Sequence, residues 1–206
     1  MSLFLTFLIA ATVLAFTPGP GITYVIARTA SGGRAEGRAS CLGTALGGMV
    51  HVLAAAFGLS AALASSALAF SAIKYLGAAY LIYLGIRLLQ SYLPTEIAIS
   101  APALGFRRAL RGGAVVEALN FKTAIFFLAF LRQFVVAGEP SVPQFLVLGT
   151  ICVALNTCVA VLAVFGAARF VGSGAVKAAR ERLLTRASGV TMLGLGVYLA
   201  AAKREA

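Results

Sequence analysis

Long uncharged runs constrain this chain more than any other feature of its sequence. Met1 to Ala27 contains no Asp, Glu, Lys or Arg, and neither does the stretch from Ala39 to Ile73. About 20 apolar residues are enough to cross the hydrocarbon of a bilayer, so each run can form a transmembrane helix. Of the 206 residues 61% are hydrophobic and 11% are charged, against about 25% charged in soluble domains. The sequence predicts an all-α integral membrane protein with residues 1–206 in one domain.

Six transmembrane helices follow from the spacing of the apolar runs. The run from Ala39 to Ile73 would be roughly 50 Å long as one helix, so it must turn, and residues 63–71 are the expected place. The predicted helices are Leu3 to Ala27, Ala39 to Ala64, Ser71 to Gln90, Ala114 to Val136, Gln144 to Val171 and Ala187 to Ala202. Residues 28–38 and 91–113 are expected to be loops.

The net charge of +11 does not indicate a nucleic-acid partner, because the basic residues are distributed as the positive-inside rule predicts for a membrane protein. Lys and Arg cluster at 28–38, 107–111 and 177–186, whereas 65–70 and 137–143 contain neither. Short basic loops stay in the cytoplasm, so both termini are expected outside. The halves, residues 1–90 and 114–206 joined by a cytoplasmic linker at 91–113, then enter the membrane from opposite sides, which is the plan of a 3+3 inverted repeat.

Pro18, Gly19, Pro20 and Gly21 predict a break in the first helix, because proline removes a backbone donor and clashes with the preceding turn. One interpretation is a binding site, in which the second half-helix offers N–H groups to a carboxylate and the unwound carbonyls accept an ammonium group. The other interpretation is a kink that only aids packing.

Asn120 and Lys122 are the counterpart in the second half, because a lysine within a span normally faces a cavity or finds a partner. Glu117 is the nearest acid, but it shares a face with Lys122 only if the helix is distorted, since five residues turn about 140°. The alternative places Glu117 and Lys122 at the cytoplasmic interface, with their charged ends reaching water. Arg132 is predicted to anchor the end of this helix at the membrane interface.

His51, the single histidine, is a candidate proton carrier, because an unperturbed histidine changes charge between pH 5 and 8. The alternative is a hydrogen bond from its ring to a neighbouring backbone group. Tyr80 either lines the pathway or packs in the core, since its hydroxyl needs a partner within the membrane. Gly43 and Gly47 form a GxxxG face, which predicts close helix packing.

Four stretches carry a family resemblance: FTPGP (16–20), GGRAEGRASCLGTALGGMVHVLAAAFGLSA (32–61), LGAAYLIYLGIRLL (76–89) and NFKTAIFFLAFLRQF (120–134). They resemble the lysine exporter (LysE) family, and most closely its homoserine/threonine efflux (RhtB) branch. The resemblance implies a six-helix exporter of amino acids or close derivatives in the bacterial inner (plasma) membrane, driven by the proton gradient and often a homodimer. The family reads PGPN, NPK and FLPQF where this chain has Gly21, Phe121 and Arg132.

A secondary transporter that exports small amino acids or their derivatives, with no covalent chemistry and no cofactor or metal, is the function predicted. It would act by proton antiport, with Glu117 weighing more than His51 in the coupling, in contact with membrane lipid. A divalent-metal exporter is an alternative that requires a cluster of Asp, Glu, His or Cys side chains as metal ligands. The chain has no Asp and one His, which disfavours it. Export of another small solute and a non-transporting membrane scaffold are the remaining alternatives.

Overall fold

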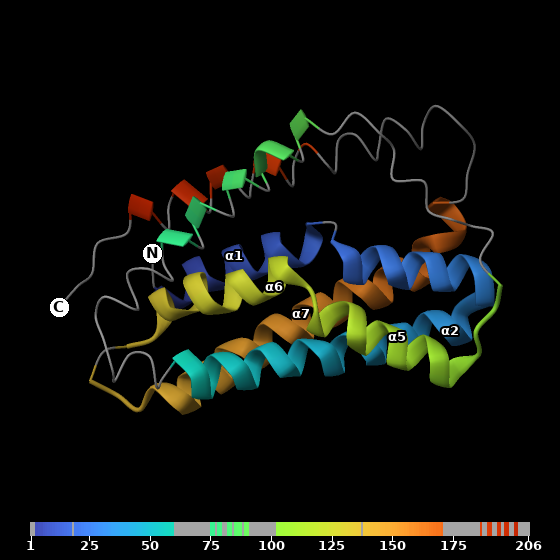
Figure 1. Cartoon of the computed structure of the whole chain (residues 1–206), viewed down its shortest axis with the longest axis horizontal. Helices are drawn as coiled ribbons and strands as arrows, with labels where there is room; N and C mark the ends of the chain where they lie inside the picture. The colour runs from blue at the N-terminus through green and yellow to red at the C-terminus, as the bar shows by residue number, and fades with distance from the viewer. Residues whose placement is uncertain are drawn as a thin grey trace.

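The fold, taken from a computed structural model, is helical throughout the part of the chain that it describes. That part comprises residues 3–17, 19–59, 102–136 and 138–170, with separate helical residues between 75 and 90 and between 186 and 201. No strand occurs among these residues, and the main helices run along one long axis (Figure 1). The all-α prediction is confirmed for the described residues.

The first predicted helix is broken, as the prolines predicted. α1 (Leu3–Phe16) ends before Thr17, and α2 (Pro20–Leu53) begins after an extended Gly19 with φ −145° and ψ 177°. Proline is well suited to the first helical position, because its missing N–H has no helical partner there in any case. The break therefore lies slightly before the predicted one, and Pro20 and Gly21 belong to the first turn of α2.

α2 turns back on itself at Gly33, whose φ of 72° is a backbone conformation that favours glycine. Residues eight apart on a straight helix are about 12 Å apart along its axis, yet a Cβ on Gly37 would collide with Oγ1 of Thr29. The two arms of α2 run in opposite directions, blue and then cyan in Figure 1. The predicted loop at 28–38 is wrong, because one glycine suffices for the turn and both flanks remain helical. The second arm continues as a π-helical segment, η1 (Ala54–Leu59).

The helix predicted from Ala114 to Val136 differs in two ways from the structure. α5 (Phe106–Ala118) begins inside the predicted linker, so the basic residues at 107–111 are helical. A break at Asn120 then separates α5 from α6 (Phe121–Ile125), and the segments on either side meet at 45°. α6 continues through the π-helical η2 (Phe126–Phe130) and the 3-10 turn η3 (Leu131–Phe134).

The break at Asn120 arises without a proline. Its side-chain oxygen accepts a hydrogen bond from the Lys122 backbone N–H at 3.1 Å, and its backbone is extended with ψ 100°. Asparagine is among the strongest N-cap residues, because its side chain satisfies a backbone donor that the new helix leaves free. Phe121 in place of the family's proline therefore leaves the distortion in place.

α7 (Ser141–Phe170) agrees with the predicted helix at Gln144 to Val171. By length and apolar character alone, Ser141–Gly166 is a candidate membrane span, and so is the stretch Pro20–Gly58, which contains the reversal at Gly33. The bent pair of α5 and α6 to η3 makes a third candidate. The largest buried side chains are mainly phenylalanines from α1, η2 and α7: Phe7, Phe126, Phe127, Phe130 and Phe145. These side chains form the hydrophobic core against which the broken helices pack.

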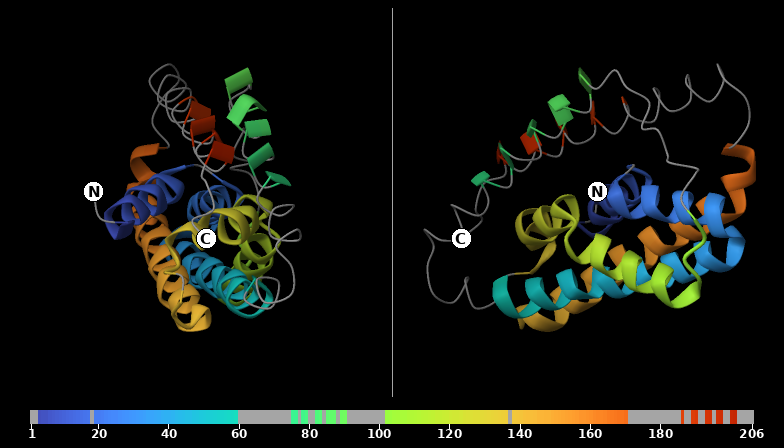
Figure 2. Two further views of the ribbon diagram at one scale, coloured as in Figure 1. Left: turned by 90° about the vertical axis from the view of Figure 1, so that its left-hand side faces the viewer. Right: turned by 45° about the vertical axis from the view of Figure 1, so that its right-hand side comes forward.

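Glycines bring several helices into backbone contact. A Cβ on Gly43 would collide with the Leu110 carbonyl, and one on Gly47 with the Ala114 carbonyl, so α2 packs directly on α5. The predicted packing role of this GxxxG face is confirmed. The described residues of the helices predicted at 71–90 and 187–202 are helical, and the two segments lie side by side (Figure 2). A Cβ added to Gly85 or to Gly189 would meet the backbone of the other segment. The predicted turn at 63–71 lies outside the described residues.

Candidate functional site

The Lys122 ammonium group binds the broken end of α1. Its Nζ donates to the Thr17 carbonyl at 2.9 Å and lies 3.5 Å from the Leu14 carbonyl. In a continuous helix the Leu14 carbonyl would accept from residue 18, but a proline there has no N–H to donate. A cation at a helix C-terminus also interacts favourably with the helix dipole. The Leu14 carbonyl also accepts from the Thr17 N–H at 3.2 Å, so the main contact of Lys122 with the end of α1 is its hydrogen bond to the Thr17 carbonyl.

Glu117 lies at the end of α5, where the helix break holds its carboxylate. Oε1 accepts from the Thr123 hydroxyl at 2.7 Å, and Oε2 accepts from the Asn120 amide at 3.2 Å. No ion pair joins Glu117 to Lys122 among the described residues, although the two charges interact. The break therefore gives Glu117 neutral partners and directs Lys122 toward α1.

Gly21 allows the Glu117 carboxylate to reach the start of α2. A Cβ at position 21 would collide with Oε2 of Glu117, so no other residue fits there without a shift of that carboxylate. The N–H groups at the start of a helix have no carbonyl partner within it and carry its positive dipole end. Glu117 thus lies directly against the first turn of α2, with its hydrogen bonds made to Asn120 and Thr123.

His51, on the second arm of α2, contacts the backbone of Glu117 and not its carboxylate. Nε2 lies 2.8 Å from the Glu117 carbonyl oxygen, and the ring is buried. Since a carbonyl only accepts, the ring donates its Nε2–H. The structure therefore matches the alternative in which the histidine bonds to a backbone group.

A small cavity opens beside Glu117, between α2, α5, α6 and α7. Its volume of about 30 Å³ is enough for a water molecule or an ammonium group. Its polar lining consists of Thr44, Glu117, Thr123, Asn156 and Thr157, and its apolar lining includes Ile22, Phe127 and Val153. The first break of the chain reaches the same cavity through Gly21.

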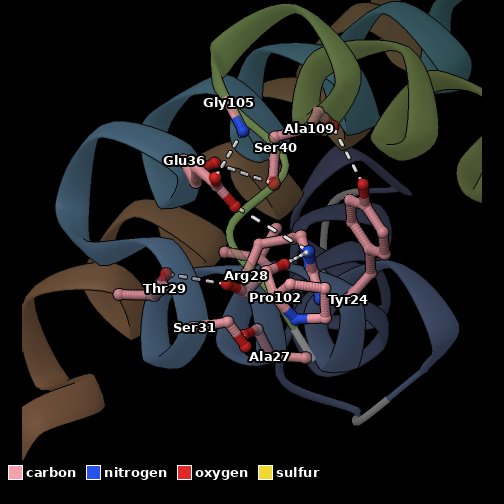
Figure 3. Close-up of polar contacts among 11 residues, drawn as sticks. Tyr24, Ala27, Arg28, Thr29, Ser31, Glu36, Ser40, Pro102, Gly105 and Ala109 are labelled. Atoms are coloured by element: carbon pink, nitrogen blue, oxygen red, sulfur yellow. Dashed lines mark hydrogen bonds and ion pairs between the residues drawn. The ribbon is translucent and has the colours of Figure 1, made fainter. Parts of the chain in front are cut away.

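A second polar cluster joins the turn of α2 to the chain before α5 (Figure 3). Arg28 and Glu36 are buried, 3.8 Å apart between Nη1 and Oε2, although both were predicted in a loop. Glu36 Oε1 accepts from the Gly105 N–H at 2.6 Å, and Arg28 Nη1 donates to the Pro102 carbonyl at 3.2 Å. This cluster fixes the helix reversal in place and lies apart from the cavity at Glu117.

The predicted site residues are largely brought together. Gly19, Gly21, Glu117 and Lys122 meet at the two breaks, since a Cβ on Gly19 would lie 3.0 Å from Lys122 Nζ. Pro18 and Tyr80 lie outside the described residues. α7 also contributes Asn156 and Thr157 to the cavity, which was not predicted. The signal for it was Asn156, an amide within an apolar run, because polar residues inside spans mark pathways.

The LysE type translocator family matches residues 12–203 of this chain, so the chain belongs to this family of membrane transporters. An uncharacterized membrane protein of Vibrio cholerae is 31% identical over 204 residues, covering 97% of each chain. Proteins named homoserine/homoserine lactone efflux protein are 28% identical in Salmonella typhi and 29% in Salmonella typhimurium, each over 96% of this chain and 95% of the relative. No solved structure matches the chain.

Proposed function

We propose that this chain is a secondary transporter that exports small amino acids or their derivatives across the bacterial inner (plasma) membrane by proton antiport. The observation that carries the proposal is the meeting of two broken helices beside a carboxylate-lined cavity. Lys122 of the second break binds Thr17 of the first, and Glu117 lies against Gly21 at the edge of the cavity. Discontinuous helices of this kind form substrate and ion sites in transporters.

The proposed architecture has six transmembrane helices in a 3+3 inverted repeat, with half-repeats at residues 1–90 and 114–206. The two breaks support it, because each interrupts the first helix of its half. The N-terminus and C-terminus lie outside the cell, and the basic blocks lie in the cytoplasm. Assembly as a homodimer in the lipid bilayer is part of the same proposal.

The substrate path passes the residues at the breaks: Pro18, Gly19, Pro20, Gly21, Asn120 and Lys122, with Tyr80 as a further lining residue. The relatives named for homoserine and homoserine lactone efflux indicate small amino acids and their derivatives as substrates. Transport moves the substrate without covalent change, so no enzyme chemistry is required.

Glu117 is the proposed proton carrier. It lines the cavity, and a carboxylate there can bind or release one proton as the site faces either side of the membrane. His51 remains the second candidate, with its ring held at the Glu117 carbonyl. Among the described residues that line the cavity, Glu117 is the one acid, so the proposed coupling rests on it.

Reconstitution in liposomes tests the proposal. Purified protein should move labelled homoserine or threonine against its gradient when a pH gradient is imposed, and protein-free liposomes should not. The proposal fails if substrate movement is the same with and without the pH gradient, or if the protein moves neither compound.

A further inference from the structure

Three side chains of α2 bind the backbone of residues 102–109, at the start of α5 (Figure 3). Arg28 and Glu36, on either side of the helix reversal, bind a carbonyl and an N–H group of this backbone. One turn before Arg28, the Tyr24 hydroxyl donates to the Ala109 carbonyl at 3.2 Å. We call Tyr24, Arg28, Glu36 and residues 102–109 the latch. The latch joins the first half of the proposed inverted repeat to the chain that leads into the second half.

Between the latch and the cavity, α2 and α5 are in direct backbone contact. A Cβ on Gly113 would lie 2.7 Å from the Ser40 carbonyl oxygen, so no solute passes between the two helices at this level. The cavity lining begins one turn further along each helix, at Thr44 and Glu117. The proposed orientation puts the latch on the cytoplasmic side. The contact of α2 with α5 therefore closes this side of the cavity toward the cytoplasm.

The charged part of the latch is incompletely bonded. Arg28 Nη1 and Glu36 Oε2 are 3.8 Å apart, which is beyond hydrogen-bond distance, and Oε2 is buried without a hydrogen bond from any described residue. A buried charged pair adds little net stability, because the cost of desolvation offsets much of the attraction. A buried acceptor without a donor adds a further cost, which entering water removes. The latch therefore has the properties of a contact that can separate.

We propose that the latch is a cytoplasmic gate, which holds α5 against α2 while the cavity is closed to the cytoplasm and separates when substrate is loaded. The inference rests on the proposed export function, because an exporter admits its substrate from the cytoplasmic side. Separation breaks no hydrogen bond within a helix, since each latch bond runs from a side chain of α2 to the backbone near α5. Residues 102–105 are not helical, so the start of α5 is free of a rigid connection there.

A weaker latch should increase the fraction of molecules that are open to the cytoplasm. Loss of one hydrogen bond shifts an equilibrium of this kind by about two- to tenfold. The apparent affinity for a solute on one side depends on the fraction of molecules open to that side. Weakening the latch should therefore lower the KM for cytoplasmic substrate, whereas the KM for substrate on the outside should not fall.

Side-specific thiol labelling tests the gate. The reporter is Thr157→Cys in a background without native cysteines, because Thr157 lines the cavity. A charged, membrane-impermeant thiol reagent is added to inverted membrane vesicles for the cytoplasmic side and to right-side-out vesicles for the outside. Tyr24→Phe removes one hydroxyl of the latch and keeps the ring, so the fold should be retained. It should speed labelling from the cytoplasmic side by about two- to tenfold, with no increase from the outside.

A second variant and a matched control complete the test. Arg28→Met combined with Glu36→Gln removes the charged part of the latch and should give a larger increase, again from the cytoplasmic side alone. Ser31→Ala is the control, because the Ser31 hydroxyl donates to the Ala27 carbonyl of its own helix at 2.9 Å. This control should label like the reporter protein. A latch that only stabilises the fold predicts equal increases from both sides, and that result, or unchanged labelling in both latch variants, overturns the inference.

Failure of the gate and failure of the proposed function give different results. If labelled threonine is exported under a pH gradient but the latch variants leave the labelling of both sides unchanged, the gate inference is wrong and the export function stands. If the variants open the cavity to the cytoplasm while the pH gradient drives no export, the proposed function fails and the gate stands. A KM for cytoplasmic threonine that rises in Tyr24→Phe would also contradict the gate.

Discussion

Lys122→Met should destabilise the protein, because it removes the donor that satisfies the end of α1. The bond from Nζ to the Thr17 carbonyl is 2.9 Å long, and hydrogen bonds to charged groups contribute about 1.5 to 3 kcal/mol. The Leu14 contact at 3.5 Å lies at the limit of a hydrogen bond, and we assign it no energy. Methionine fills a similar volume, so no large cavity cost is added. The expected loss in the free energy of unfolding is about 1.5 to 3 kcal/mol.

The melting temperature in detergent measures this loss. For a chain of this size 1 kcal/mol corresponds to about 2 to 4 °C, so a decrease of roughly 3 to 12 °C is expected. Arg107→Met is the control, because Arg107 is exposed on α5 and its loss should change stability by less than about 0.5 kcal/mol. If Lys122→Met melts like wild type and only weakens substrate binding, Lys122 is a substrate ligand and its role at the α1 break is refuted.

Three further predictions address other parts of the structure. Gly21→Ala should displace the Glu117 carboxylate, lowering stability by about 1 to 3 kcal/mol and efflux in liposomes with it, whereas Gly58→Ala has open space and should leave both unchanged; equal effects would contradict the close approach at Gly21. Arg28→Met should cost about 3 to 5 kcal/mol in melting experiments by leaving Glu36 buried and unpaired, and adding Glu36→Gln should restore part of it; a double mutant as unstable as the sum of the two would refute the pairing. In a background without native cysteines, single cysteines at positions 34, 108 and 182 should be labelled from the cytoplasm alone, and those at 66 and 141 from outside alone. Labelling of position 108 from outside would refute the inverted repeat.

The sequence predicted the elements whose cause is local. The prolines at 18 and 20 predicted the first break, because a proline acts on its own helix whatever lies around it. The apolar run from Gln144 to Val171 predicted α7 nearly to its ends. The turn at Gly33 was placed in a loop, because its flanking basic residues carry the composition of a loop while their backbone stays helical.

The site was predictable in its residues and not in its contacts. Glu117 and Lys122 stood out because charges within spans are rare. Their separation onto different partners depends on the break at Asn120, and a single capping side chain decides that break. The Asn156 amide and the Thr157 hydroxyl that line the cavity donate to carbonyls of their own helix, and such bonds cannot be read from residue spacing.

Substrate protection of Thr157→Cys tests most directly whether substrate binds where the two broken helices meet. Thr157 lines the cavity at Glu117, and the variant would carry no other cysteine. We expect saturating threonine to slow labelling of this cysteine in liposomes by about tenfold, and a cysteine placed at position 141 in a separate variant to label at an unchanged rate. Labelling of Thr157→Cys at the same rate with and without substrate, in protein that still exports threonine, would contradict the account.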